Sequence, residues 1–490
     1  MFLKAGALSL ALLLASRLLG LVRESAQAAA FGTSGLADVV VLMLTLPDWL
    51  AGVLAAGALA YVLLPAWAAQ LPAQVAATQR KVAVGLIGGG ILLALLLVLL
   101  RRPALDWLAG GLPAGMRPAA AGALVWSAVA LPAALLAGLW TTRLQHERDF
   151  TGMYSANLVV NAVVIGAILW AATRPGDAVP WLGAGLLGAM VLRLGWLHWR
   201  TPRGNGAGAI VEPGGAPTLP LPLPSVWLWA VLSAGLPLAL PFAARSVASQ
   251  AGEGALATFN YAWKLVELPL ILAIQLVATL AFPGIAKALA AEDPAATMRA
   301  VRTAMALAWA LACAAAAALL VGAPAIAQLL FGWGRMEPPA LARVAHWGGI
   351  GAWGLLPQAL IAVALTVLAA RGRMRAAVWA YALALALLLA YGAWDNSDGA
   401  RLMILLNLLL AGVAAAVIAA LGSQVRAWMP WRSMAISLVC LLAIAALALP
   451  SALGQPADPW AGLLLAGFGG VLVIGATWWG SGDMRSALAR

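Results

Sequence analysis

The sequence predicts an all-α integral membrane protein with about 14 transmembrane helices, in two pseudo-symmetric bundles plus a C-terminal helix pair, around a central cationic cavity. The first observation is composition: 64% of the 490 residues are hydrophobic, 9% are charged, and the mean hydropathy is +0.96. A soluble domain carries about 25% charged residues, so this class is excluded. The second is that apolar runs of bilayer length recur, without the period-two alternation of a β-barrel. The third is that most of the charges inside those runs fall in only four of them.

Apolar runs bounded by proline, glycine or charged residues define the predicted spans. In chain order they are 3–30, 36–68, 82–100, 119–142, 154–172, 181–199, 225–249, 256–281, 300–323, 344–370, 376–393, 402–421, 434–449 and 460–479. Residues 1–200 then form an N-terminal six-helix bundle and 225–421 a second one, joined by a cytoplasmic Gly/Pro-rich linker over 201–224. Residues 422–490 form a C-terminal two-helix extension. No soluble stretch is long enough for a catalytic domain, so an enzyme is not expected.

The basic residues set the predicted orientation. With the N-terminus in the cytoplasm, the inner segments hold 17 lysines and arginines, and the outer loops hold 7. Cytoplasmic loops of membrane proteins are enriched in basic residues, and an even number of spans returns the chain to its starting side. Both termini are therefore predicted to be cytoplasmic.

The first span contains the most unusual group of charges, Arg17, Arg23 and Glu24. Each charge at mid-bilayer costs about 2.5–3.5 kcal/mol on insertion scales, so these side chains should avoid lipid. At 100° per residue, Arg17 and Glu24 fall on nearly the same face with Gly20 between them, and Arg23 stacks over Ser16. The group is interpreted as an anion-binding wall. The alternative is an intramembrane ion pair that only fixes packing.

The eighth span places Tyr261, Lys264 and Glu267 at i, i+3 and i+6, on one side of a helix. Pro269 follows and is expected to weaken the helix and free a backbone carbonyl. The functional interpretation is a cation presented to an anionic substrate. The other interpretation is a Lys264–Glu267 pair that merely neutralises itself.

The second span carries acids in an apolar context. Asp38 lies near its outer end, and Pro47 and Asp48 are expected to interrupt its middle. Gly57 belongs to a run of small residues that allows another helix to approach closely. A broken helix with an acid at mid-depth suits a moving gate element. It could equally be a kink with a capping aspartate.

Two further arginines lie in spans. Arg245 is predicted to add to the cavity or to lie near its outer mouth. Arg193, close to the inner interface, is expected to extend its guanidinium to the level of the lipid headgroups.

Three buried cations with few acids favour a multiply charged anion such as a pyrophosphate, although a dicarboxylate fits the same charge. No Gly-rich nucleotide loop and no His/Cys cluster occurs, so no cofactor, metal or nucleic acid is expected. Energy would come from the membrane potential, an ion gradient or the substrate gradient. A cation-coupled drug exporter would favour buried acids over buried cations.

The ordered motifs of the chain resemble those of the MurJ/MviN lipid II flippases, in the multidrug/oligosaccharidyl-lipid/polysaccharide exporter superfamily. They are S-R-L-L-G-L-V-R-E over 16–24, A-F-G over 30–32, A-D over 37–38, L-P-D over 46–48, G-A over 57–58, Y-A-W-K-L-V-E-L-P over 261–269 and F-P over 282–283. The resemblance implies that Arg17, Arg23 and Lys264 line a cationic cavity for a lipid-linked pyrophosphate-sugar, supported by Asp38.

The implied substrate is lipid II, the undecaprenyl-pyrophosphate-linked peptidoglycan precursor. It would be flipped to the periplasmic leaflet of the bacterial inner membrane by alternating access, with its tail beside the last two spans. Membrane lipids and cell-wall synthesis proteins are the implied partners. Two alternatives remain: export of another polyprenyl-linked oligosaccharide of the O-antigen type, or a non-transporting scaffold. The scaffold is motivated by Gly52 and Ala56, where the family usually carries a basic residue and an acid, and by Lys264 in place of an arginine.

Overall fold

The computed structural model describes residues 2–68, 70–201, 222–394, 398–448 and 458–488, and these residues form helices and no strand. Thirteen helical segments among them are long and apolar enough to cross a membrane. They are preceded by α1 (Phe2–Phe31), whose 30 residues span about 45 Å. Each of the predicted spans coincides with a helical segment, which confirms the all-α membrane fold. Most of the predicted linker, residues 202–221, lies outside the described residues.

The chain divides into two compact units. Unit 1 comprises Met1–Phe242 and Gly252–Leu256, and unit 2 comprises Ala243–Ala251 and Ala257–Arg490. The helices of unit 1 after α1 are α2 (Gly35–Val53), α3 (Leu59–Ala68), α4 (Pro72–Leu99), α5 (Arg101–Leu108), α6 (Arg117–His146), α7 (Phe150–Ala172), α8 (Ala178–Arg200) and most of α9 (Pro224–Ala248).

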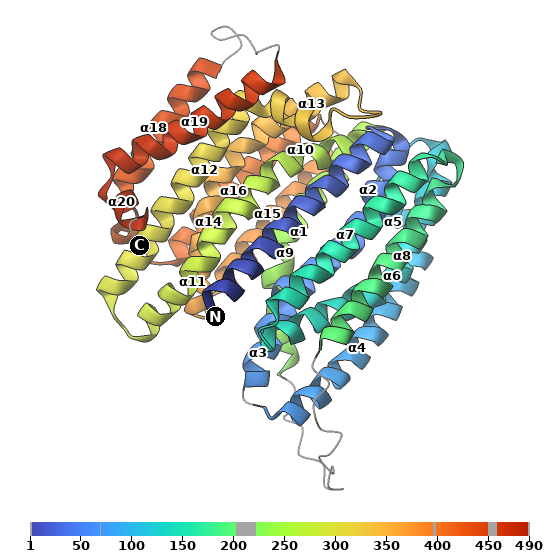
Figure 1. Cartoon of the computed structure of the whole chain (residues 1–490), viewed down its shortest axis with the longest axis horizontal. Coiled ribbons are helices and arrows are strands. Elements are labelled where there is room, and N and C mark those ends of the chain that lie inside the picture. Colours follow the sequence, from blue (N-terminus) through green and yellow to red (C-terminus); the bar gives the residue numbers. More distant parts are fainter. Residues whose placement is uncertain (1, 69, 202–221, 395–397, 449–457, 489–490) are drawn as a thin grey trace. The chain divides into compact units, whose positions relative to one another are not determined.

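Unit 1 is built around α6, which contacts α2, α3, α4, α5, α7 and α8 (Figure 1). Its buried face consists largely of alanine, with leucines between, so neighbouring backbones approach closely. The Ser127 hydroxyl on this face donates to the Met43 carbonyl of α2 at 2.7 Å. A hydrogen bond of this kind between two buried helices fixes their relative depth within the unit.

Unit 2 contains α10 (Ala255–Pro269) from Ala257 on, and the helices that follow it. These are α11 (Gln275–Ala290), α12 (Pro294–Phe331), α13 (Pro338–Gly351), α14 (Leu355–Ala370), α15 (Arg375–Trp394), α16 (Gly399–Ala420), α17 (Val425–Trp428), α18 (Trp431–Ala448), α19 (Pro459–Gly480) and α20 (Gly482–Leu488).

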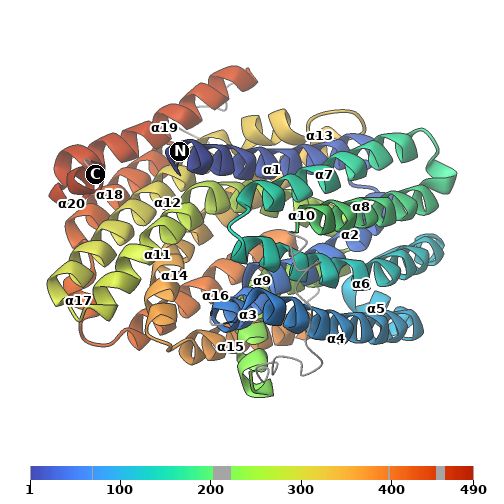
Figure 2. The same cartoon turned by 60° about the horizontal axis from the view of Figure 1, so that its bottom comes forward.

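The 38-residue α12 is the centre of unit 2, with α11, α13, α14, α18 and α19 packed against it (Figure 2). Asp293 caps its N-terminus by accepting hydrogen bonds from the amides of Ala295 and Ala296 at 2.9 Å. Small residues hold α19 close, since a Cβ on Gly322 would lie 2.4 Å from the Cβ of Ala466.

Both units contain one span broken by a π-helical segment. In unit 1 the segment is η1 (Leu54–Ala58), between α2 and α3, and in unit 2 it is η5 (Leu270–Ile274), between α10 and α11. These are the second and eighth spans, which hold corresponding places in the two predicted bundles. Short π segments inside helices frequently mark functional positions.

The prediction that Leu46-Pro47-Asp48 interrupts the second span is wrong in position. α2 continues as a regular helix through Pro47 to Val53, and the irregular segment begins at Leu54. A proline removes one donor and crowds the preceding turn, and here the helix accommodates it without ending. Pro269, by contrast, ends α10 and directly precedes η5, as predicted.

Candidate functional site in the charged spans

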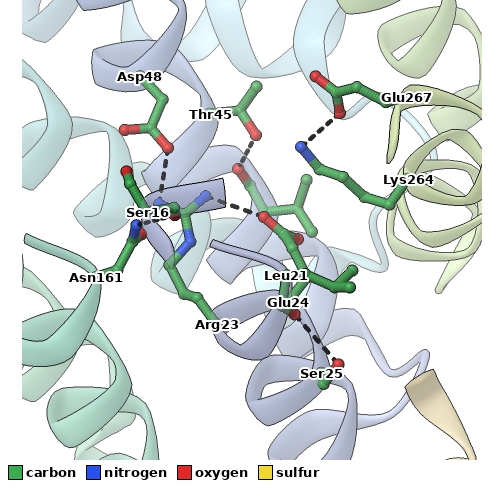
Figure 3. A network of polar contacts seen from close by, with 11 residues as sticks. Ser16, Leu21, Arg23, Glu24, Ser25, Thr45, Asp48, Asn161, Lys264 and Glu267 are labelled. Atoms are coloured by element: carbon green, nitrogen blue, oxygen red, sulfur yellow. Dashed lines mark hydrogen bonds and ion pairs between the residues drawn. The ribbon is translucent and has the colours of Figure 1, made fainter. Parts of the chain in front are cut away.

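Arg23 is the centre of a polar network within unit 1 (Figure 3). Its Nη1 donates to Oδ2 of Asp48 at 2.9 Å, and its Nη2 donates to Oε1 of Glu24 at 3.0 Å. The Arg23 and Glu24 side chains are 13% and 7% exposed, whereas that of Asp48 is 40% exposed. The guanidinium is thus held between a buried acid on its own helix and a more accessible acid on α2.

Helical spacing predicts a shared face for Arg17 and Glu24 but does not predict the ion-pair partner of Glu24. The acid pairs with its neighbour Arg23. A long arginine side chain can fold back to an adjacent residue even though the two Cβ atoms point about 100° apart. The interhelical partner Asp48 lies 25 residues further along the chain.

Arg17 remains accessible. Its side chain is exposed, and it makes no hydrogen bond or ion pair with any residue that the structure describes. It lies within electrostatic range of Tyr154 on α7. The neighbouring Ser16 is buried, and its carbonyl accepts a 3.5 Å hydrogen bond from Nδ2 of Asn161. The sequence did not predict the contact of Asn161, although an amide side chain in an apolar span would have indicated it.

Asp38 is buried and accepts a hydrogen bond from a backbone amide. The residue is 2% exposed, and its Oδ2 accepts a 2.7 Å hydrogen bond from the amide of Gly254. Beside it, Oε1 of Glu253 accepts a hydrogen bond from the Gly35 amide at 2.8 Å. The N-terminus of α2 and the segment Gly252–Leu256 are therefore fastened together inside unit 1.

Lys264 and Glu267 pair on α10 as their spacing predicts. Lys264 Nζ lies 2.7 Å from Oε2 of Glu267, and the two side chains are 23% and 26% exposed (Figure 3). Tyr261, predicted on the same side, is fully buried, and its ring lies 5.1 Å from that of Phe331. Tyr261 therefore packs in the core of unit 2, while the ion pair remains partly accessible to solvent or ligand.

The remaining predicted residues fall in both units. Arg245 lies in the last turn of α9, in the part that belongs to unit 2. Gly57 lies in η1, where a Cβ would be 2.4 Å from that of Ala234 on α9. This close approach agrees with the small-residue surface that the sequence predicts.

Arg193 does not behave as its sequence position suggests. It lies on α8 and is only 8% exposed, so it is buried in unit 1 and not extended to the membrane surface. Its Nε is buried with no hydrogen-bond partner, and the acid that acts on its charge is Asp48. The sequence could have indicated this burial, because Arg193 precedes the end of α8 at Arg200 by two helical turns.

A pocket of about 580 Å³ lies in unit 2 between α12, α13 and α16. Apart from His346 its lining is apolar or backbone, with Leu320, Pro324, Trp353 and Ile404 among the contributors. None of the predicted site residues lines it. The pocket lacks the guanidinium or ammonium groups that bind a phosphate.

The charged site residues can bind an anion. Arginine is permanently charged and offers five donors in a planar fork that matches phosphate or carboxylate. In unit 1 Arg23 is paired with Glu24 and Asp48, Arg193 is buried, and Arg17 is exposed. In unit 2 Lys264 is balanced by Glu267. The common cavity for Arg17, Arg23 and Lys264 stays a prediction, because these side chains belong to separate units.

The sequence profile of the family described as "Lipid II flippase MurJ" matches residues 27–453. This chain belongs to the MurJ family. A probable lipid II flippase MurJ from Rhizobium meliloti (strain 1021) is 27% identical over 365 residues, which cover 71% of this chain. The chain spans 66% of that relative's length, just under two thirds.

Among solved structures, a lipid II flippase MurJ in an inward closed conformation aligns with a TM-score of 0.77. The alignment covers 99% of this chain and all of the other, at 14% identity. An inward-facing multidrug resistance transporter of the MATE family, in the MOP superfamily, aligns with a TM-score of 0.62 over 88% of this chain and 96% of its own, also at 14% identity. Both likenesses concern the fold. Membership of the MurJ family favours the lipid II flippase prediction over the O-antigen exporter and the scaffold, and it agrees with the many membrane-spanning helices of the chain.

Proposed function

We propose that this MurJ-family chain moves lipid II from the cytoplasmic to the periplasmic leaflet of the bacterial inner membrane. The observation that carries the proposal is the match of the family profile to residues 27–453, a range that includes Asp48 and the Lys264–Glu267 pair. Lipid II joins a diphosphate to a long polyprenyl chain. A protein that moves it must therefore offer cations to the headgroup at membrane depth.

The diphosphate is bound by Arg17, Arg23 and Lys264. Arg17 offers a guanidinium without a partner among the described residues, whereas Arg23 and Lys264 are held by carboxylates. Pairing with an acid balances the charge of a cation in a low-dielectric environment while no substrate is bound. A diphosphate offers more acceptor oxygens and more negative charge than one carboxylate, so it competes for the same donors.

Transport proceeds by alternating access. The π-helical breaks η1 and η5 lie in corresponding spans of the two predicted bundles, a position typical of substrate sites in repeat-built transporters. Gly57 in η1 allows α9 to approach closely, which suits a gate element. Both termini lie in the cytoplasm, no cofactor is required, and the membrane potential or an ion gradient supplies the energy.

The proposal is tested with purified protein in vesicles loaded with labelled lipid II. Arg17→Ala and Arg23→Ala are expected to abolish flipping while the protein still inserts and folds. Arg174→Ala is the matched control, because Arg174 is an exposed arginine that stacks on Trp170 at 3.9 Å, at the C-terminal end of α7. Normal flipping by both site variants would overturn the proposal. Mass spectrometry of lipids that copurify with the protein identifies the lipid-linked sugar, and rescue of a flippase-depleted strain separates a transporter from a scaffold.

A further inference from the structure

Arg193 is a buried cation without an ion-pair partner of its own. It is 8% exposed, and no described carboxylate lies within the 4.0 Å of an ion pair. Its charge is permanent at any physiological pH. An isolated charge in a low-dielectric interior is costly, so a nearby anion is needed to balance it.

The acid that acts on Arg193 is Asp48, and Asp48 is already bound to Arg23. The helices that carry the two residues, α2 and α8, are in contact within unit 1. One carboxylate therefore binds the Arg23 guanidinium and also acts electrostatically on that of Arg193. Both of these also keep a buried Nε without a hydrogen-bond acceptor, so the arrangement offers more donors than Asp48 can satisfy.

Asp48 is also the more accessible of the two acids on Arg23. Its side chain is 40% exposed, whereas that of Glu24 is 7% exposed. A carboxylate close to water can leave its partner and remain hydrated. The buried Glu24 would instead lose its charge-assisted hydrogen bond without an equivalent replacement.

We propose that the Asp48 carboxylate occupies the position that a phosphate group of the substrate takes between Arg23 and Arg193. Asp48 is then an internal competitor that the arriving diphosphate displaces, and Arg193 is a further phosphate-binding residue. The inference rests on the proposed function, since it assumes that Arg23 binds the substrate. It adds Arg193 of α8 to the site, and it implies that the charge of residue 48 controls the affinity for lipid II.

The test measures the Kd of lipid II for the full-length protein in detergent micelles. Asp48→Asn keeps the shape of the side chain and removes its charge, so binding should tighten about fivefold to tenfold, the equivalent of one charge-assisted hydrogen bond. Arg193→Gln should weaken binding by a similar factor, and Arg193→Lys should restore most of it. Inorganic pyrophosphate, added as a competitor, should displace lipid II from the Asp48→Asn protein at lower concentration than from the unmodified protein.

Two comparisons keep the inference separate from the proposed function and from simple misfolding. If Arg23→Gln leaves lipid II binding unchanged, the proposed site itself is wrong. If Arg23→Gln weakens binding while Asp48→Asn and Arg193→Gln leave the Kd unchanged, only the inference is overturned. Weaker binding by Asp48→Asn would overturn it as well, because a competitor cannot be a binding residue. Thermal unfolding of each variant, with Arg174→Gln as control, confirms that every measured Kd belongs to folded protein.

Discussion

The amide of Gly254 donates a 2.7 Å hydrogen bond to Oδ2 of Asp38, although 216 residues separate the two in the chain. Asp38 is buried, and Gly254 has a φ of +76°, a left-handed conformation that favours glycine. A Cβ at position 254 would also lie 1.9 Å from the carbonyl oxygen of Thr33. The acid of the second span thus fastens the segment between α9 and α10 to the start of α2.

Loss of this contact should destabilise the protein. Asp38→Ala removes the carboxylate that accepts from the buried Gly254 amide, and the loss of such a buried hydrogen bond costs about 1–3 kcal/mol. Asp38→Asn keeps an acceptor oxygen and should cost less. Gly254→Ala should destabilise at least as much as Asp38→Ala, because of its φ and the clash with Thr33. Thermal unfolding in detergent measures all three, and an unchanged Tm for Asp38→Ala would contradict the structural role.

The contact between η1 and α9 predicts a compensating pair of substitutions. Gly57→Ala places a Cβ 2.4 Å from that of Ala234, and overpacking of this kind costs about 1–3 kcal/mol. Adding Ala234→Gly removes the opposing methyl group, so the double variant should recover most of the lost stability and transport. Gly166→Ala on α7 is the control, because no heavy atom lies within 4 Å of its Cβ position. Equal Tm values for the single and double variants would show that the close approach is not what limits this position.

Substitutions at Lys264 test whether its ammonium binds substrate or only neutralises Glu267. Lys264→Gln removes the ammonium that lies 2.7 Å from Glu267, and flipping should fall about tenfold, the effect of one charge-assisted hydrogen bond. Lys264→Arg keeps the charge and should retain transport. The double variant Lys264→Gln/Glu267→Gln carries no charge at the pair and should remain slow. Recovery of normal flipping in the double variant would mean that the pair only neutralises itself.

The loop before α7 predicts a pH-dependent contribution to stability. Asp149 accepts hydrogen bonds from Nε and Nη2 of Arg200 at 2.9 and 2.8 Å and from the Gly152 amide at 2.9 Å. Partial burial acts to raise the pKa of Asp149, but the hydrogen bonds from Arg200 and Gly152 outweigh it and hold the pKa below its ordinary value of 3.8. Folding therefore favours the ionised form, and the contribution is present above the unfolded pKa and lost as the pH falls through the folded value.

Asp149→Asn keeps the helix cap and removes the charge, so it isolates this contribution. At neutral pH the variant should be less stable by roughly 0.5–1 kcal/mol, the range of a partly exposed ion pair. The Tm difference from the unmodified protein should stay constant above about pH 5 and shrink below about pH 4. Thermal unfolding across this range measures it, and a difference that grows on acidification would contradict the assignment.

Hydropathy predicted the spans because a bilayer requires about 20 consecutive apolar residues, a property written directly in the chain. Helical spacing predicted the Lys264–Glu267 pair in the same way, since residues three apart are neighbours on one side of a helix. The predicted interruption at Pro47 was wrong, because α2 continues through this proline. Helical spacing also gave no partner for Glu24, whose carboxylate pairs with the adjacent Arg23.

The sequence by itself determined the membrane class, the order of the spans, the family resemblance and the set of charges placed inside the membrane. Only the tertiary structure decided which partner each charge meets, Asp48 for Arg23 and Gly254 for Asp38. It also decided that Arg193 is buried. The physical reason is that these contacts join different helices or distant segments. They depend on how far each helix is rotated and how deep it lies, and helices that are apolar on nearly every face leave both quantities open until they pack.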